Sequence, residues 1–212
     1  MRNDTKTAPR GRGRPRKFDE EAALRAALQR FRTLGYSNTS LDELAAATGV
    51  NRPSLYATFG DKKALYLAGL ARTHAVIDST FAALHAMGYP PEKMLKALFL
   101  GAIEGFLTGE HGPSGCIAVN TAAAEAVTDP DIRAALAAFM ALQDGWIERL
   151  MAQAGSADPR GDAQVASSVI HSLSTRARAG TPRDELIAIA KKATALLLAE
   201  PNTLRNPDGE TK

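Results

Sequence analysis

The chain has 212 residues, of which 45% are hydrophobic and 23% are charged, the ordinary mixture of a globular protein that can bury a core. Its single cysteine excludes an internal disulfide and a cysteine-rich zinc site. No apolar run approaches the roughly 18 residues of a membrane span, and no apolar stretch follows the basic N-terminus, so we expect a cytoplasmic protein without a signal peptide.

The formal net charge is +3, but the positive charge is concentrated at the N-terminus. Residues 1–18 contain seven lysines and arginines against Asp4, which gives this segment +6 and leaves −3 for the remainder. A basic arm on a mildly acidic body indicates a polyanionic partner such as nucleic acid. A solvated tail that serves only solubility is the alternative interpretation.

Apolar residues recur at helical spacing nearly everywhere and no alternating strand pattern is found, so the sequence predicts an all-α fold of about nine helices. The first helix is expected from Asp19 to Leu34, where Gly35 ends it. Further helices are expected over 41–48, 52–59, from 61 toward the break at 88–91, and over 91–108, 116–128, 130–154, 162–179 and 182–199. The expected organisation is a basic arm (1–16), a three-helix unit (17–77), a helical bundle (78–200) and a frayed tail (201–212).

The two short helices at 41–48 and 52–59 form a helix-turn-helix pattern. Gly49 permits a left-handed residue in the turn, and Ala45 is small where the two helices cross. The second helix keeps a polar face toward solvent, made of Arg52, Ser54, Tyr56 and Thr58. Such a helix can enter the DNA major groove and offer donors to base edges and phosphates. An ordinary helical hairpin has the same periodicity and is the alternative.

Three segments of this region resemble a known family: TSLDELA at 39–45, GVNRPSLYATF at 49–59 and DKKALY at 61–66. They closely resemble the DNA-binding domain of the TetR/AcrR family of bacterial repressors, over residues 17–77. The resemblance implies a homodimer that binds palindromic double-stranded DNA, with a C-terminal bundle that takes a small inducer and forms the dimer interface. It implies neither an enzymatic activity nor a cofactor.

The resemblance also implies roles for single positions. Phosphate contacts are implied for Tyr56, for Lys62, and for Thr39 or Ser40 at the start of the second helix. Arg52 and Ser54 are implied to face the groove, and an arginine fork reads guanine because it reaches O6 and N7 together. Lys63 matches no fixed family position, and we expect it to be solvated.

Inside the basic arm, Arg12-Gly13-Arg14-Pro15 matches the core of an AT-hook, and Arg16 follows it. Glycine keeps the backbone thin and proline keeps it extended, so the arginines can lie in a narrow A·T minor groove. We therefore expect Arg12, Arg14 and Arg16 to contact DNA. A non-specific tether to phosphates is the alternative.

The segment GPSGCIAVN at 112–120 resembles a branch of the same family in which a Gly-Cys pair opens the sixth helix and some members sense oxidants or electrophiles. Cys116 is therefore a candidate sensor, since a helix dipole would lower the pKa of a thiol at its N-terminus and Arg178 could add positive charge. A small buried hydrophobe is the alternative role of this cysteine.

Three further side chains are candidates, with Cys116, for the wall of a ligand cavity: Phe106, Met140 and Trp146. Apolar stripes at helical spacing also form ordinary core, which is the alternative. The last two predicted helices can form a four-helix interface with a second subunit or pack within one chain, since the first carries small residues and the second carries Leu186, Ile189, Leu196 and Leu197. These small residues include Ala163, Ala166 and Ser167.

The sequence favours a dimeric, nucleoid-associated repressor that a small molecule, an oxidant or an electrophile releases from its operator. A DNA-architectural protein without an inducer is a second hypothesis. A thiol enzyme using Cys116 and His111 is a third, although no Asn or Asp that would orient the histidine is evident. None of the four histidines forms a metal-type pair with another His or with Cys, so no metal site is expected.

Overall fold

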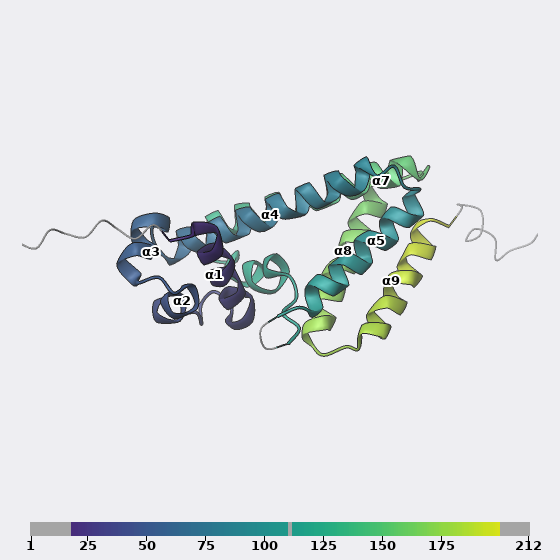
Figure 1. Ribbon diagram of the computed structural model, residues 1–212. Coiled ribbons are helices and arrows are strands. Elements are labelled where there is room, and N and C mark those ends of the chain that lie inside the picture. The colour runs from purple at the N-terminus through teal and green to yellow at the C-terminus, as the bar shows by residue number, and fades with distance from the viewer. Residues whose placement is uncertain (1–17, 110–111, 200–212) are drawn as a thin grey trace, which may run out of the picture.

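The computed structural model describes residues 18–109 and 112–199, and every regular element in these ranges is helical (Figure 1). In chain order the elements are α1 (Glu20–Leu34), α2 (Leu41–Thr48), α3 (Arg52–Phe59), α4 (Lys62–Ala86), α5 (Pro91–Leu107), η1 (Ala118–Ala122), α6 (Ala123–Glu125), α7 (Pro130–Gln153), α8 (Pro159–Arg178) and α9 (Arg183–Leu197). The all-α fold class predicted from the periodicity is confirmed.

Short polar side chains fix where the first four helices begin. The side chains of Asp19, Asn51 and Asp61 each accept a hydrogen bond from a backbone N–H three residues further on. Ser40 and Glu43 form a reciprocal capping box at the start of α2. Each cap satisfies a donor that the helix itself leaves unpaired, which is why α2 and α3 are well defined with only eight residues each.

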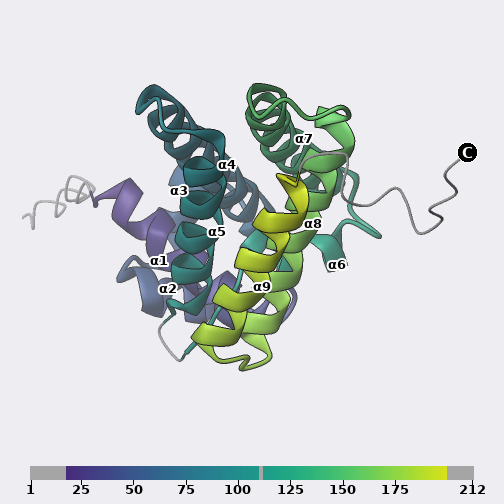
Figure 2. The same ribbon diagram turned by 90° about the vertical axis from the view of Figure 1, so that its right-hand side faces the viewer.

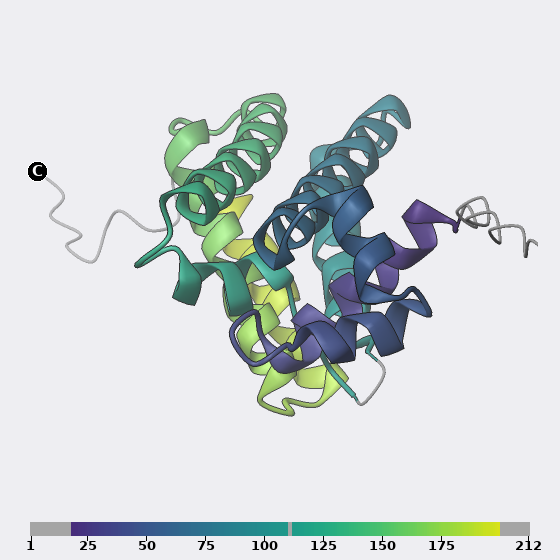
Figure 3. The same cartoon turned by 90° about the vertical axis from the view of Figure 1, so that its left-hand side faces the viewer.

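The first three helices and the start of α4 pack around one apolar cluster at one end of the molecule (Figures 1 and 3). Phe31 and Tyr66 are fully buried at its centre, with their rings edge to face and the centroids 5.0 Å apart. Leu44 and Leu55 attach α2 and α3 to this cluster. The cluster also contains Ile132 of α7, so apolar packing crosses the boundary between the N-terminal unit and the bundle.

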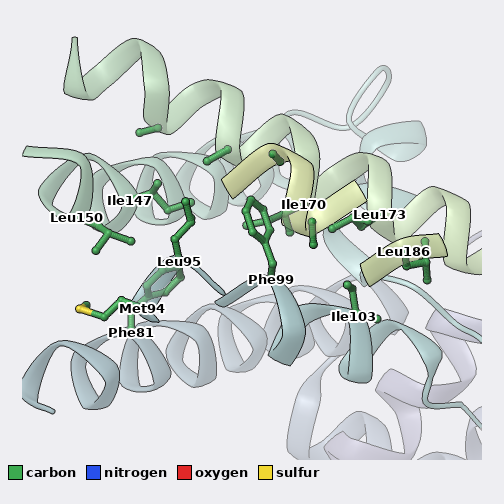
Figure 4. Close-up of a cluster of buried hydrophobic side chains, with 14 of the residues drawn as sticks. Phe81, Met94, Leu95, Phe99, Ile103, Ile147, Leu150, Ile170, Leu173 and Leu186 are labelled. Carbon is green, nitrogen blue, oxygen red and sulfur yellow. The ribbon is translucent and has the colours of Figure 1, made fainter. Parts of the chain in front are cut away.

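The bundle is built from α5, α7, α8 and α9 together with the last turns of α4. Leu95 and Phe99 of α5 are fully buried and point toward α7 and α8 (Figure 4). Helices α8 and α9 lie side by side, and both contact α5 (Figure 2). Helix α4 belongs to both parts, because Tyr66 lies in the N-terminal cluster and Phe81 in the bundle core. It is therefore a continuous connection between them.

The segment predicted as one α-helix over 116–128 is irregular. It consists of the π-helical turn η1 followed by the single turn α6. The hydroxyl of Ser174 in α8 accepts hydrogen bonds from the backbone N–H of Cys116 and from the side-chain amide of Asn120. These two bonds hold both ends of the first turn against α8. Such π-turns are frequent at functional sites.

The small residues of α8 pack within the chain. Ala163, Ala166 and Ser167 are at most 3% exposed, and α8 contacts both α5 and α7. Small side chains let α8 approach α5 and α7 closely, so packing within one subunit explains why α8 carries a row of small residues. The interpretation of these three residues as an intersubunit surface is therefore wrong.

Gly49 ends α2 with a φ of 67°, a left-handed conformation that is costly for a residue with a Cβ. We expect Gly49→Ala to lower the free energy of unfolding by about 1–2 kcal/mol. Gly145→Ala in α7 is the matched control, because an added Cβ meets no atom within 4 Å there. Since alanine is the better helix former, this variant should gain up to about 1 kcal/mol. Urea denaturation measures both, and effects of the same sign would contradict the prediction.

Candidate nucleic-acid interface and effector cavity

Helix α3 lies at the end of the molecule that faces the viewer in Figure 3, and its expected polar face consists of Arg52, Ser54, Tyr56 and Thr58. Leu55 is buried against α2 and α4, which orients the helix. Arg52, Tyr56 and Thr58 are exposed, whereas Ser54 is half-buried. Three of the four residues expected on this face are thus free to meet a nucleic acid, and Ser54 lies at its edge.

Arg52 forms an ion pair with Asp42 of α2. Both side chains remain largely exposed, at 48% and 77% of their full accessibility. Exposed pairs of this kind contribute about 0–1 kcal/mol, so the guanidinium can exchange the carboxylate for a base edge or a phosphate at little cost. The pair therefore holds Arg52 on the polar face without occupying it permanently.

The two candidates at the start of α2 differ in position. Thr39 is fully buried, and its hydroxyl donates to the carbonyl of Gly35 at 2.6 Å. The predicted phosphate contact of the Thr39 side chain is therefore wrong, because this side chain is buried and stabilises the turn before α2 instead. Ser40 is exposed, its hydroxyl oxygen accepts from the backbone N–H of Glu43, and its side chain also hydrogen-bonds the carboxylate of Glu43. Ser40 is the candidate that the geometry retains.

The two lysines at the start of α4 contact different groups. The ammonium of Lys62 lies 4.5 Å from the centroid of the Tyr36 ring, and partial burial lowers the pKa of Lys62. Its phosphate contact stays a prediction. Lys63 is not simply solvated as the sequence suggested, because its Nζ lies 2.9 Å from Asp129 and 2.5 Å from Asp131. These hydrogen bonds raise the pKa of Lys63 and join α4 to the start of α7.

The three arginines expected in the minor groove, Arg12, Arg14 and Arg16, lie outside the described residues. Their contacts stay a prediction.

A cavity of about 500 Å³ lies between the N-terminal unit and the bundle. Its wall comes from α1, α4, α5, α7, α8 and the segment 115–117 before η1. The polar part of the wall includes His171, whose ring nitrogen lies 3.1 Å from Oε1 of Gln143, and burial lowers the pKa of His171. A volume of this size accommodates a drug-sized organic molecule.

Two of the four expected cavity residues, Phe106 and Cys116, line this cavity. Met140 and Trp146 do not. Met140 is 41% exposed on the outer side of α7, and Trp146 stacks on Phe81 while its indole N–H donates to Asp78. The residues of α7 that line the cavity are Phe139 and Gln143. Helical periodicity selects the right helix but does not say which of its sides meets the cavity.

The sequence did not point to Arg32, a charged side chain of α1 that lies where the N-terminal unit meets the bundle. Its Nη2 donates to the carbonyls of Gly105 at 3.1 Å and Gly115 at 2.7 Å, and its Nη1 donates to Gln29. Arg178 reaches the same turn from α8 and donates to the carbonyl of Arg32 itself at 3.0 Å. No sequence signal marks Arg32, because its partners are distant in the chain.

Cys116 lies at the start of the η1 turn, in the cavity wall, and is half-buried. Burial raises the pKa of its thiol, although the N–H groups of Ala118 and Val119 and the charge of Arg32 act in the opposite direction. The expected lowering of the pKa is therefore wrong, because desolvation outweighs the helix terminus. Arg32 supplies the nearby positive charge that was expected from Arg178.

In the described ranges, no group of three or more His, Cys, Asp or Glu residues is arranged to hold a metal ion. Within the same ranges, no helix combines the length and the apolar character needed to cross a bilayer.

Comparison with known proteins assigns the family. Residues 23–68 match the family described as bacterial regulatory proteins, tetR family. The HTH-type transcriptional repressor ComR of Escherichia coli K12 is 33% identical over 199 residues, which cover 89% of this chain and 93% of that protein. BdcR of the same strain, also an HTH-type transcriptional repressor, is 44% identical over 62 residues, which cover 29% of this chain and 32% of that protein.

Solved structures agree with these relatives. A cysteine variant of the TetR family regulator CifR, determined with 26-base-pair operator DNA, is 28% identical and has a TM-score of 0.73, covering 85% of this chain and 98% of that chain. A TetR family regulator from Agrobacterium tumefaciens has a TM-score of 0.74 at 18% identity, covering 83% and 95%, which is a likeness of fold alone. This chain therefore belongs to the TetR family of bacterial regulatory proteins and is a DNA-binding transcriptional regulator.

Proposed function

We propose that this regulator is a homodimeric repressor that binds a palindromic operator and leaves it when a small molecule occupies the cavity. Residues 17–77 would bind DNA with the help of the arm at 1–16, and residues 78–200 would hold the effector and the dimer interface. Such a protein would act in the cytoplasm, on the nucleoid. The observation that carries the proposal is the cavity of about 500 Å³, whose wall includes α1 and α4, two helices of the DNA-binding unit that adjoin α2 and α3.

The wall of the cavity connects an effector with the DNA-binding unit. Leu28 and Arg32 of α1 and a series of α4 residues from Arg72 to Leu84 contribute to it. A bound molecule would therefore contact both α1, which packs on α2, and α4, which follows α3. This arrangement favours an inducible repressor over a DNA-architectural protein, which has no need for such a cavity.

Repression and operator binding are supported by the relatives. ComR and BdcR are both named as repressors, and the CifR structures contain operator DNA. A dimer is supported by exposed apolar side chains on neighbouring helices. Val165 of α8 and Leu196 of α9 are each 54% exposed, and these helices lie side by side (Figure 2). Burial against a second copy would remove this surface from water.

The test begins with DNA selected by the full-length protein from a random pool. The bound sequence is expected to be a palindrome, because half-site order mirrors the symmetry of the protein. The complex is then challenged with a metabolite collection, and release of the DNA is followed by fluorescence anisotropy. A selected site without a dyad contradicts the dimeric mode, and a complex that no small molecule releases contradicts the inducer.

Replacing Arg52 tests whether the polar face of α3 contacts the bases of the operator. We expect Arg52→Ala to lose about 1–3 kcal/mol of operator affinity and to relax preference at one base per half-site, because the bidentate contact to guanine is removed. Asp42→Ala is the matched control, since it removes the ion-pair partner and leaves Arg52 in place. Its affinity should equal or exceed that of wild type. Anisotropy titrations on single-base operator variants measure both effects, and unchanged base preference in Arg52→Ala excludes it as a reader.

Deleting residues 1–16 tests the arm. We expect weaker DNA binding and a smaller salt dependence, with the log–log slope reduced by roughly 0.9 for each phosphate that the shortened protein no longer neutralises. If Arg12 and Arg14 enter the minor groove, the preference for A·T pairs that flank the palindrome disappears as well. Binding measured at several salt concentrations separates the two interpretations, because a mere tether loses affinity without changing the flanking preference.

A second signal, an oxidant or electrophile, is favoured by one observation: Cys116 lies in the cavity wall. Because burial raises the pKa of its thiol, we expect iodoacetamide to react with Cys116 more slowly at pH 7.5 than with an unfolded cysteine. The rate should keep rising with pH above about 8.5, the ordinary thiol pKa. Mass spectrometry of the modified protein follows the rate.

The signal itself is tested on the DNA complex. Peroxide or iodoacetamide is expected to release the wild-type protein and to leave Cys116→Ser bound. Equal release of the two proteins, or release of neither, removes the thiol as a signal and leaves the non-covalent inducer.

A further inference from the structure

The charged residues of the cavity wall are all positive. Three arginines, Arg25, Arg32 and Arg72, contribute to it, and none of its described residues is an aspartate or glutamate. Arg25 and Arg72 share the single carboxylate of Glu21, at 3.1 and 2.6 Å. One carboxylate thus pairs with two of the three arginines, so the end of the cavity that these arginines line has a net positive charge.

Arg32 is the arginine whose charge is not compensated. Its partners are the carbonyls of Gly105 and Gly115 and the side-chain amide of Gln29, and in the described ranges no carboxylate forms an ion pair with it. Its Nε–H is buried and has no hydrogen-bond partner there. A half-buried cation without a counter-ion carries a desolvation cost, and the unmade hydrogen bond of its buried Nε–H adds to that cost. An anion in the cavity would relieve both.

The rest of the wall is mostly apolar. Ile77, Phe81 and Leu84 of α4 and Leu98 of α5 line it, and all of these except Leu84 also pack in the bundle core. Gly101 on α5 also lines it, and the space where its Cβ would be is open. The cavity therefore offers an apolar compartment with a cationic end, which fits a molecule that has an acidic head and an apolar body.

We propose that the effector is an apolar organic carboxylate whose head pairs with the guanidinium of Arg32 and whose body lies against α4 and α5. This inference rests on the proposed function and names the chemical class of its inducer. A carboxylate binds a guanidinium best through two parallel bonds, here from Nε–H and the adjacent Nη2–H. Since Nη2 already donates to Gly105 and Gly115, the carboxylate would compete with these carbonyls and loosen the attachment of α1 to the bundle.

The test compares acids with their own amides, which have nearly the same shape without the charge. The DNA-free, full-length protein is titrated by calorimetry with decanoate and decanamide, and with 4-phenylbutyrate and its amide. We expect at least one acid to bind about tenfold or more tightly than its amide. Arg32→Met should remove this preference, and Arg32→Lys, which keeps the charge without the fork, should retain part of it. Arg183→Met, an exposed arginine outside the cavity wall, should keep it fully.

The acid–amide comparison in the wild type needs no variant, so it decides the matter even if Arg32→Met does not fold. Equal binding of acid and amide, binding of neither acid, or an undiminished preference in folded Arg32→Met would each overturn the proposal. Operator release is measured in parallel. An acid that binds through Arg32 without releasing DNA supports the ligand class and contradicts the proposed inducer function. An amide that releases DNA better than its acid supports that function and overturns the ligand class.

Discussion

The C-terminal turn of α1 is held by two arginines that approach it from opposite directions. Arg32 leaves α1 and donates to carbonyls of the bundle, while Arg178 leaves α8 and donates to the carbonyls of Arg32 and Thr33. The last carbonyls of a helix have no partner within it, and they carry the negative end of its dipole, so a guanidinium is well suited to this position. All of these acceptors are backbone oxygens, so Arg32 fixes α1 to the main chain of the bundle and Arg178 fixes α8 to the main chain of α1.

A second attachment lies on the other side of the same unit. Lys63 at the start of α4 pairs with Asp129 and Asp131 at the start of α7, and Ser37 donates to Glu125 of α6 at 2.7 Å. With two attachments and a shared apolar cluster, the polar face of α3 has a defined orientation relative to the bundle. In a dimer this orientation would set the spacing of the two recognition helices, and half-site spacing on DNA tolerates little error. A coupling free energy of about 1–3 kcal/mol is then enough to control binding.

Local features were predictable because they depend on neighbours in the sequence. The caps at Asp19, Ser40 and Asn51 and the left-handed Gly49 each act within a few residues, and Gly49 ends α2 where the sequence predicted a left-handed residue. The contacts between the DNA-binding unit and the bundle were not predictable, because they join residues that are distant in the sequence. Arg32 finds its carbonyl partners 73 and 83 residues further along the chain, and no local pattern encodes such a distance.

The same difference explains the candidates that failed or changed role. An amphipathic pattern identifies Met140 and Trp146 as apolar residues of a helix, but which side of α7 meets the cavity depends on how α4 and α8 pack. Cys116 does follow a Gly at the start of a helical turn, as expected. Its pKa is nevertheless raised, since desolvation depends on the surrounding α1, α5 and α8 rather than on its own turn.

Arg32 also connects the two proposed signals, because it contacts the cavity and its charge favours the thiolate of Cys116. A carboxylate bound at this guanidinium would neutralise that charge, so the pKa of Cys116 would rise further and its thiol would become less reactive. Conversely, a thiolate formed at Cys116 would repel the carboxylate. The two signals would thus compete for one cation instead of reinforcing each other. A regulator built in this way would respond to one of them at a time, and either signal would have to change the attachment of α1 to the bundle.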